Sequence, residues 1–130
     1  MNNNPNQFKK QKYINLETFR KNGEGVKTPV WFAEDGETLR IWTEGGSGKV
    51  KRIRRDGKVR ITPSTADGRS LGEWLETNAI VFESPEEIQH TKDLFLKKYG
   101  WMFKMFALLG KVRRGRFVTL EIKLNSSPAN

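Results

Sequence analysis

Short segments in which apolar and polar residues alternate make up most of this chain, and turns that contain Gly separate them. An alternation with a period of two is typical of β-strands that bury one face. Leu39 and Ile41, and further along Val59 and Ile61, are expected to face the core of such a sheet. The pattern predicts strands over residues 13–20, 26–34, 38–43, 57–63, 72–83 and 116–124.

Helical spacing replaces the alternation in one long segment between the last two predicted strands. Ser84 and Glu87 form a capping box, and Pro85 occupies the first helical position. Residues at every third or fourth position from 88 to 109 are then apolar apart from Lys92, which predicts an amphipathic stripe. Gly100 is expected to divide this segment into two helices, and Gly110 is expected to end the second.

These elements favour a mainly β fold with an inserted helical segment. A six-stranded meander in so short a chain would leave two sheet edges open unless it closed on itself. We therefore predict a closed, six-stranded β-barrel. A single domain is expected over residues 13–124, with a flexible N-terminal segment over 1–12 and a disordered tail over 125–130.

Composition narrows the possible partners and compartments. The chain has 130 residues, a net charge of +9 and no Cys. Excess positive charge on folded surface favours an acidic or phosphorylated partner, and the lack of Cys excludes disulfides, thiolate nucleophiles and Cys-based zinc sites. The N-terminus lacks the apolar run of a signal peptide, and no segment approaches the roughly 20 apolar residues of a membrane span. We therefore expect a soluble, cytoplasmic protein.

Residues 47–60 concentrate much of the positive charge, with seven Lys or Arg and a single acid. Ser47 is a good N-cap residue after a Gly-Gly turn, so a helix is expected to begin there with unpaired backbone N–H groups. A helix N-terminus attracts anions, and Lys49, Lys51 and Arg52 would add full charges. The segment therefore predicts a site for a phosphate or another anion, although a solvated helix face remains the alternative for Lys51.

Four stretches of the sequence carry a resemblance to a known family. They are YINLETFR at 13–20, TPVWF at 28–32, IWT at 41–43 and SGKVKRI at 47–53. In order and spacing they resemble the pyridoxamine 5'-phosphate oxidase-like split β-barrel superfamily, and within it the deazaflavin (coenzyme F-420) dependent oxidoreductases. The resemblance implies a homodimer with a flavin or deazaflavin between its subunits. It also implies hydride transfer between that cofactor and a small organic substrate, without a catalytic side chain.

The resemblance assigns cofactor binding to three short stretches of this chain. The strand at 28–31 would run past the ring, and the strand end and turn at 42–49 would bind the phosphate, with two cations one helical turn deeper. The excess of cations, which would meet a polyglutamate tail, favours coenzyme F-420 over FMN. Gly48 departs from the Arg that FMN oxidases of the family commonly have, which argues against tight FMN binding. The residues expected to bind the cofactor are Thr28, Pro29, Val30, Trp31, Trp42, Thr43, Ser47, Lys49, Lys51 and Arg52.

The residues leave other functions open. One alternative is an FMN-binding relative of pyridoxamine phosphate oxidase. Another is a carrier that binds flavin or haem without turnover. For haem, only His90 offers an imidazole ligand. Small basic barrels with surface aromatics such as Trp42 and Phe117 also bind single-stranded nucleic acid. However, such a groove needs cations spread over a strand face, whereas here they concentrate in 47–60, with a second cluster of unassigned role at Arg113, Arg114 and Arg116.

Overall fold

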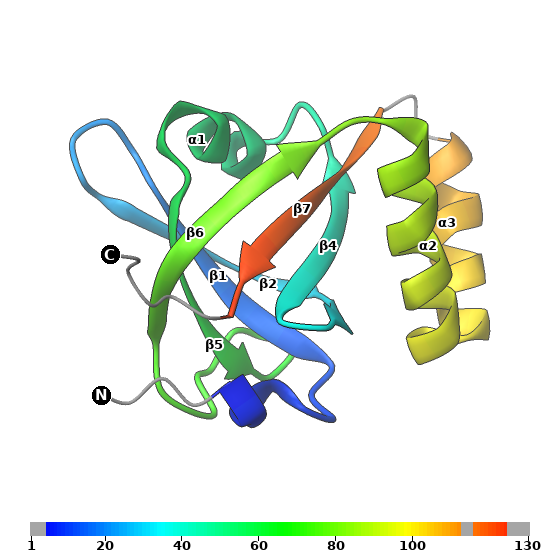
Figure 1. Cartoon of the computed structure of the whole chain (residues 1–130), viewed down its shortest axis with the longest axis horizontal. Coiled ribbons are helices and arrows are strands. Elements are labelled where there is room, and N and C mark those ends of the chain that lie inside the picture. Colours follow the sequence, from blue (N-terminus) through cyan, green and yellow to red (C-terminus); the bar gives the residue numbers. More distant parts are fainter. Residues whose placement is uncertain (1–4, 113–115, 125–130) are drawn as a thin grey trace.

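The computed structural model describes residues 5–112 and 116–124, which form one curled antiparallel sheet with helices around it (Figure 1). The mainly β prediction is confirmed, with seven strands where six were predicted. Their order across the sheet is β2-β1-β5-β6-β7-β4-β3. The strands are β1 (Tyr13–Phe19), β2 (Gly25–Trp31), β3 (Ala33–Asp35), β4 (Thr38–Glu44), β5 (Lys58–Ser64), β6 (Leu75–Phe82) and β7 (Phe117–Lys123).

The additional strand arises from a break in the second predicted strand. Phe32 divides the segment 26–34 into β2, which pairs with β1, and β3, which pairs with β4. β2 and β3 lie at opposite edges of the sheet although only this one residue separates them. The sheet must therefore curl until its two edges meet, which protects them as the sequence analysis required. This curled shape is consistent with the split barrel expected from the sequence.

The core fills the inside of the curled sheet. Leu39, Ile41, Val59 and Ile61 are each at most 1% exposed, as their alternation predicted. β6 joins the two halves of the sheet, because its residues 75–78 pair with β5 and its residues 79–82 pair with β7. One apolar cluster thus extends through both halves.

The N-terminal segment packs against this core. A short 3-10 helix, η1 (Pro5–Phe8), places the Phe8 ring in the main cluster with no exposed surface. The Gln7 side chain donates a hydrogen bond to the Glu73 carbonyl and accepts one from the Glu73 N–H, each 2.9 Å long. η1 therefore packs against the domain expected over 13–124, and the flexibility expected of residues 1–12 stays a prediction. Residues 1–4 and the predicted tail at 125–130 lie outside the described residues.

The described residues form three α-helices beside the sheet. The first, α1 (Gly48–Asp56), begins after Ser47 as predicted and buries Val50 and Ile53. The other two, α2 (Pro85–Tyr99) and α3 (Trp101–Val112), lie side by side next to the sheet (Figure 1). Within residues 5–112 and 116–124, no helix combines the length and the apolar character that a membrane span requires.

The boundaries of the two long helices follow the sequence signals in part. The Ser84 hydroxyl accepts a hydrogen bond from the Glu87 N–H, so the N-cap half of the predicted capping box is present, while the Glu87 carboxylate pairs with Arg40. Gly100 has a φ of 61°, a left-handed value that favours Gly, and it separates α2 from α3 as predicted. Gly110 lies inside α3, so its predicted role as the end of the helix was wrong. A Gly in a helix interior is unfavourable by about 1 kcal/mol but does not have to end the helix.

Candidate functional site

A cavity of about 390 Å³ lies where the edge strand β2, the end of β4, the start of α1 and the two long helices approach one another. It brings together stretches that are far apart in the sequence. Seven of its lining residues were predicted to bind a cofactor: Pro29, Val30, Trp31, Trp42, Thr43, Ser47 and Lys49. The remaining lining residues were not predicted: Tyr13, Glu44, Phe95, Phe106, Leu109 and Phe117.

One wall of this pocket is the edge strand β2. Pro29 lies opposite Asn15 of β1 and cannot donate a backbone hydrogen bond, which is why it is tolerated on an edge strand. Trp31 follows two residues later on the same face of the strand. Its ring stacks on that of Tyr99 in α2, with ring centroids 4.3 Å apart and an angle of 7° between the planes. The β2 wall is therefore apolar and rigidly supported.

A second aromatic wall comes from β4. The Trp42 ring stacks on Phe117 of β7 at 4.1 Å and meets the Phe103 ring of α3 edge-on at 5.2 Å. Its indole Nε1 is buried and has no hydrogen-bond partner among the described residues. A buried donor without a partner typically costs about 1–3 kcal/mol. Trp42 thus lines the pocket with an aromatic ring, and its buried N–H group is a donor without a partner among the described residues.

The polar end of the pocket lies at the start of α1. Ser47 has the extended backbone of an N-cap residue, but its side chain makes no capping bond, and its Oγ is buried without a partner among the described residues. Lys49 Nζ lies 3.4 Å from Thr43 Oγ1. Burial lowers the pKa of Lys49, and the charge of Arg52 lowers it further while that of Glu44 opposes the shift. An anion bound at this end would stabilise the protonated, charged form of Lys49.

Three residues expected at the site lie elsewhere. Thr28 alternates with Pro29 along β2 and so points to the opposite face of the strand, and Lys51 is exposed on α1. Arg52 is turned toward β1, where its Nε donates a hydrogen bond to Thr18 Oγ1 at 2.7 Å. None of these three side chains lines the pocket.

The Gly48 position explains where the Arg52 side chain lies. A Cβ atom placed on Gly48 would be 2.9 Å from the Arg52 Nη1 atom. The guanidinium group of Arg52 therefore occupies the space in which a side chain at position 48 would begin. The Gly at position 48, where FMN oxidases commonly have Arg, thus leaves room for the side chain of Arg52.

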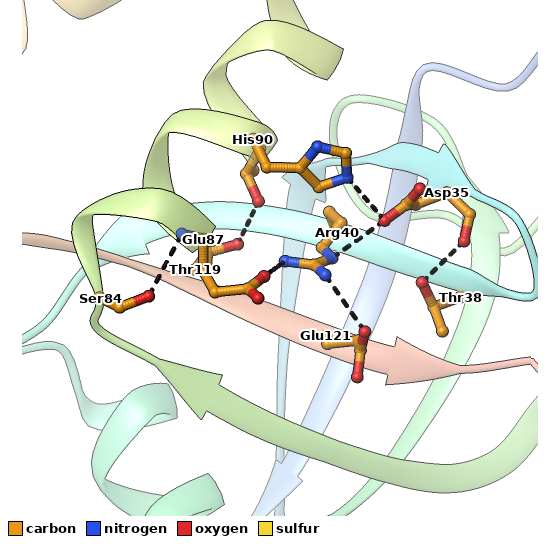
Figure 2. Close-up of polar contacts among 9 residues, drawn as sticks. Asp35, Thr38, Arg40, Ser84, Glu87, His90, Thr119 and Glu121 are labelled. Atoms are coloured by element: carbon orange, nitrogen blue, oxygen red, sulfur yellow. Dashed lines mark hydrogen bonds and ion pairs between the residues drawn. The ribbon is translucent and has the colours of Figure 1, made fainter.

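A buried arginine fixes α2 against the sheet beside the pocket (Figure 2). Arg40 of β4 forms ion pairs with Asp35 of β3 at 3.4 Å, with Glu87 of α2 at 2.7 Å and with Glu121 of β7 at 3.2 Å. The His90 Nε2 atom lies 3.0 Å from Asp35 Oδ2. The cluster thus joins β3, β4 and β7 to the helix whose next turns carry pocket residues.

A second set of contacts fixes the corner between β2 and β3. The Tyr99 hydroxyl accepts a hydrogen bond from the Phe32 N–H at 3.1 Å and lies 2.6 Å from the Phe32 carbonyl oxygen. Lys98 Nζ donates to the same carbonyl at 2.9 Å. Burial raises the pKa of Tyr99 and lowers the pKa of Lys98 to about 8, the latter shift being opposed by Glu34. The last turn of α2 therefore positions the end of β2 at the pocket.

Comparison with known proteins gives matches among solved structures only, since no protein-family model and no curated protein sequence matches the chain. HutZ, the heme storage protein from Vibrio cholerae, matches with a TM-score of 0.68 at 11% identity, over 92% of this chain and 84% of HutZ. A candidate pyridoxamine 5'-phosphate oxidase from Listeria innocua matches with a TM-score of 0.61 at 16% identity, over 88% and 85% of the two chains. An F-420 reductase matches with a TM-score of 0.60 at 17% identity, over 95% and 94%.

The chain shares their split-barrel fold. The resemblance predicted from the sequence is therefore confirmed at the level of the fold. At identities of 11–17% these matches do not transfer a ligand or a reaction to this chain.

Proposed function

We propose that this protein is an oxidoreductase that binds a flavin-type cofactor in the pocket described above, with coenzyme F-420 favoured over FMN. Hydride would pass between the cofactor and a small organic substrate. The observation that carries the proposal is a pocket with aromatic walls that ends at a buried, unpaired Ser47 Oγ and a Lys49 with a lowered pKa. The names of two structural neighbours, an F-420 reductase and a candidate pyridoxamine 5'-phosphate oxidase, support the same class.

The shape and chemistry of the pocket fit such a cofactor. Its volume of about 390 Å³ is at the low end for small-molecule sites, which suits one planar ring system. Pro29, Trp31 and Trp42 would contact the ring, and the Trp42 N–H would donate a hydrogen bond to it. Ser47, Thr43 and Lys49 would bind the phosphate. The cofactor supplies the hydride chemistry, so the protein has to bind it, orient it and exclude water.

The choice of F-420 over FMN rests on Gly48. An arginine at this position would add a charge-assisted hydrogen bond to the phosphate of FMN. Here the space next to Gly48 holds the Arg52 guanidinium, which is bonded to Thr18 instead. We therefore expect the site to bind the FMN phosphate more weakly. F-420, which carries further anionic groups, is favoured.

We propose in addition that the protein is a homodimer with the cofactor at the subunit interface. α3 supports this, because its large apolar side chains Trp101, Met105 and Leu108 are 72%, 55% and 61% exposed. Such a surface gains stability when another protein surface covers it. Light scattering at several concentrations tests this part, and a monomer at every concentration would contradict it. A cytoplasmic location stays a prediction.

Haem binding is the alternative that the HutZ match raises. His90 is the single histidine of the chain. It lies on α2, paired with Asp35, and does not line the pocket. Haem ligation by imidazole therefore has no support at this site.

The proposed function is tested by titrating the purified protein, freed of bound small molecules, with F-420, FMN and haem. Fluorescence or absorbance then gives three dissociation constants under the same conditions. Tightest binding of F-420, followed by oxidation of reduced F-420 in the presence of electron-poor organic compounds, is the expected result. Binding without turnover would leave a carrier, and failure to bind either F-420 or FMN would refute the proposal.

A further inference from the structure

A second concave surface lies between α1 and the turn that joins β1 to β2. It has a volume of about 410 Å³ and is lined by Arg20, Lys21, Asn22, Arg52 and Arg55. We name it the basic cleft. All but one of its lining residues are cations. None of them lines the candidate cofactor pocket between β2, β4 and the long helices, which we call the aromatic pocket.

The two arginines of α1 that line the basic cleft are held in place by β1. Arg52 Nε donates to the hydroxyl of Thr18, a residue that is only 1% exposed. Arg55 donates one N–H group to the carbonyl oxygen of Phe19. Each guanidinium group uses one donor in this way and, among the described residues, keeps its other donors available. The donors are thus positioned before any ligand arrives, which lowers the entropy cost of binding.

The positive charge of the basic cleft is poorly compensated. Arg20 pairs with Glu24 at 3.4 Å, but both side chains are largely exposed. Among the described residues, Lys21, Arg52 and Arg55 form no ion pair. Burial lowers the pKa of Arg52, and the neighbouring charges of Arg20 and Arg55 lower it further. Like charges held this close repel one another, and an anion in the cleft would remove that repulsion.

Arg40 shows how this chain neutralises an arginine when its role is structural. That guanidinium is surrounded by three carboxylates (Figure 2). The basic cleft has the opposite arrangement, with several cations and one peripheral acid. An anionic ligand from solution would supply the negative charge that the described residues of the cleft lack.

We propose that the basic cleft is a second ligand site, which binds the phosphate chain of a small oligophosphate compound independently of the aromatic pocket. Guanidinium groups bind phosphate oxygens with two parallel hydrogen bonds, and four cations match the charge of a chain of phosphates better than that of one. Single-stranded nucleic acid would also need aromatic rings on which bases stack. The lining of the cleft contains no aromatic side chain.

The test uses inorganic tripolyphosphate as the probe, measured by calorimetry at physiological salt. Lys21→Gln and Arg55→Gln each remove one cation of the cleft. Lys97→Gln is the matched control. Lys97 is an exposed residue on α2, and its substitution lowers the net charge of the protein by the same amount. We expect each cleft variant to bind tripolyphosphate about tenfold more weakly and the control to stay within about twofold of wild type. Unchanged melting temperatures show that the variants are folded.

Three outcomes would overturn the proposal. Equal weakening in Lys97→Gln would show a response to net charge alone. Loss of tripolyphosphate binding in Lys49→Met, with the cleft variants unaffected, would place the anion in the aromatic pocket. Tighter binding of a short oligonucleotide, with the same dependence on Lys21 and Arg55, would make the cleft a nucleic-acid surface.

A titration with F-420 separates this proposal from the proposed function. If the cleft is independent, Lys21→Gln and Arg55→Gln bind F-420 like wild type while their affinity for tripolyphosphate falls. If both affinities fall together, the cleft belongs to the cofactor site and the second site is refuted. Failure of wild type to bind either F-420 or FMN would refute the proposed function alone.

Discussion

The Lys49→Met variant tests the polar end of the pocket most directly. Methionine keeps a stem of similar length and removes only the ammonium group, which lies next to Thr43 at the pocket. A hydrogen bond between charged groups contributes about 1.5–3 kcal/mol, and each 1.4 kcal/mol is a factor of ten in affinity. The pocket is open to salt, so we expect the lower part of that range, a loss of about 10- to 30-fold in F-420 affinity.

The same variant makes a second, opposite prediction for the protein without ligand. Lys49 forms no ion pair with the described residues, and burial lowers its pKa. Removing a desolvated, unpaired charge should leave the melting temperature unchanged or raise it. A residue with a purely structural role would instead lower it. The two readouts together distinguish a binding residue from a packing residue.

The assay is a fluorescence titration with F-420 at constant ionic strength, and Lys51→Met is its matched control. Lys51 lies two residues further along α1, is exposed and does not line the pocket, so its loss changes the net charge equally. We expect the control to bind within about twofold of wild type. An equal loss in both variants would reduce the effect to overall charge, and no loss in Lys49→Met would refute the phosphate assignment.

Three further predictions concern the contacts that hold the pocket in place. Tyr99→Phe leaves the buried Phe32 N–H without its acceptor and should lower the free energy of unfolding, measured with denaturant, by about 1–3 kcal/mol. Lys98 has a folded-state pKa of about 8, below its ordinary value of 10.5, so the unfolded state binds more protons between these pH values. The free energy of unfolding should therefore rise with pH across this window in wild type, and Lys98→Met should lack this rise. Arg40→Met removes the arginine partner of three carboxylates, of which Asp35 keeps His90, and should cost toward the lower end of about 3–5 kcal/mol, because those carboxylates are partly exposed.

Each of these predictions can fail in a definite way. A Tyr99→Phe protein as stable as wild type would show that water replaces the hydroxyl at the β2–β3 corner. Parallel pH profiles for wild type and Lys98→Met would refute the lowered pKa of Lys98. If Arg40→Met lowers the free energy of unfolding by less than about 1 kcal/mol, the ion pairs of Arg40 contribute no more than ordinary surface ion pairs.

Local signals in the sequence were sufficient for most elements of the fold. The alternation placed Leu39 and Ile41 correctly in the core, and the capping box located the start of α2. The break at Phe32 has no local signal, because its neighbours Trp31 and Ala33 are apolar and no turn residue stands beside it. It results from closure of the sheet, which only the pairing of distant strands determines. Phe8 was missed for a related reason, since one apolar residue in a polar segment has no periodic pattern.

Local sequence signals likewise predicted only part of the candidate site. Ser47 and Lys49 were predicted because a turn before a basic helix is a local signal for anion binding. Arg52 comes from the same signal, yet the direction of its side chain depends on Thr18 and on the space beside Gly48. The pocket residues of α3 were missed, because the sequence shows an apolar helix but not the strand ends that it approaches.

Phe32 has a consequence for how related chains can differ in length. It is the single residue between β2 and β3, and its neighbours Trp31 and Ala33 both pack in the aromatic cluster under α2. One inserted residue here would reverse the side-chain alternation that follows and turn one of these neighbours away from the cluster. Evolution should therefore have kept this connection at one residue.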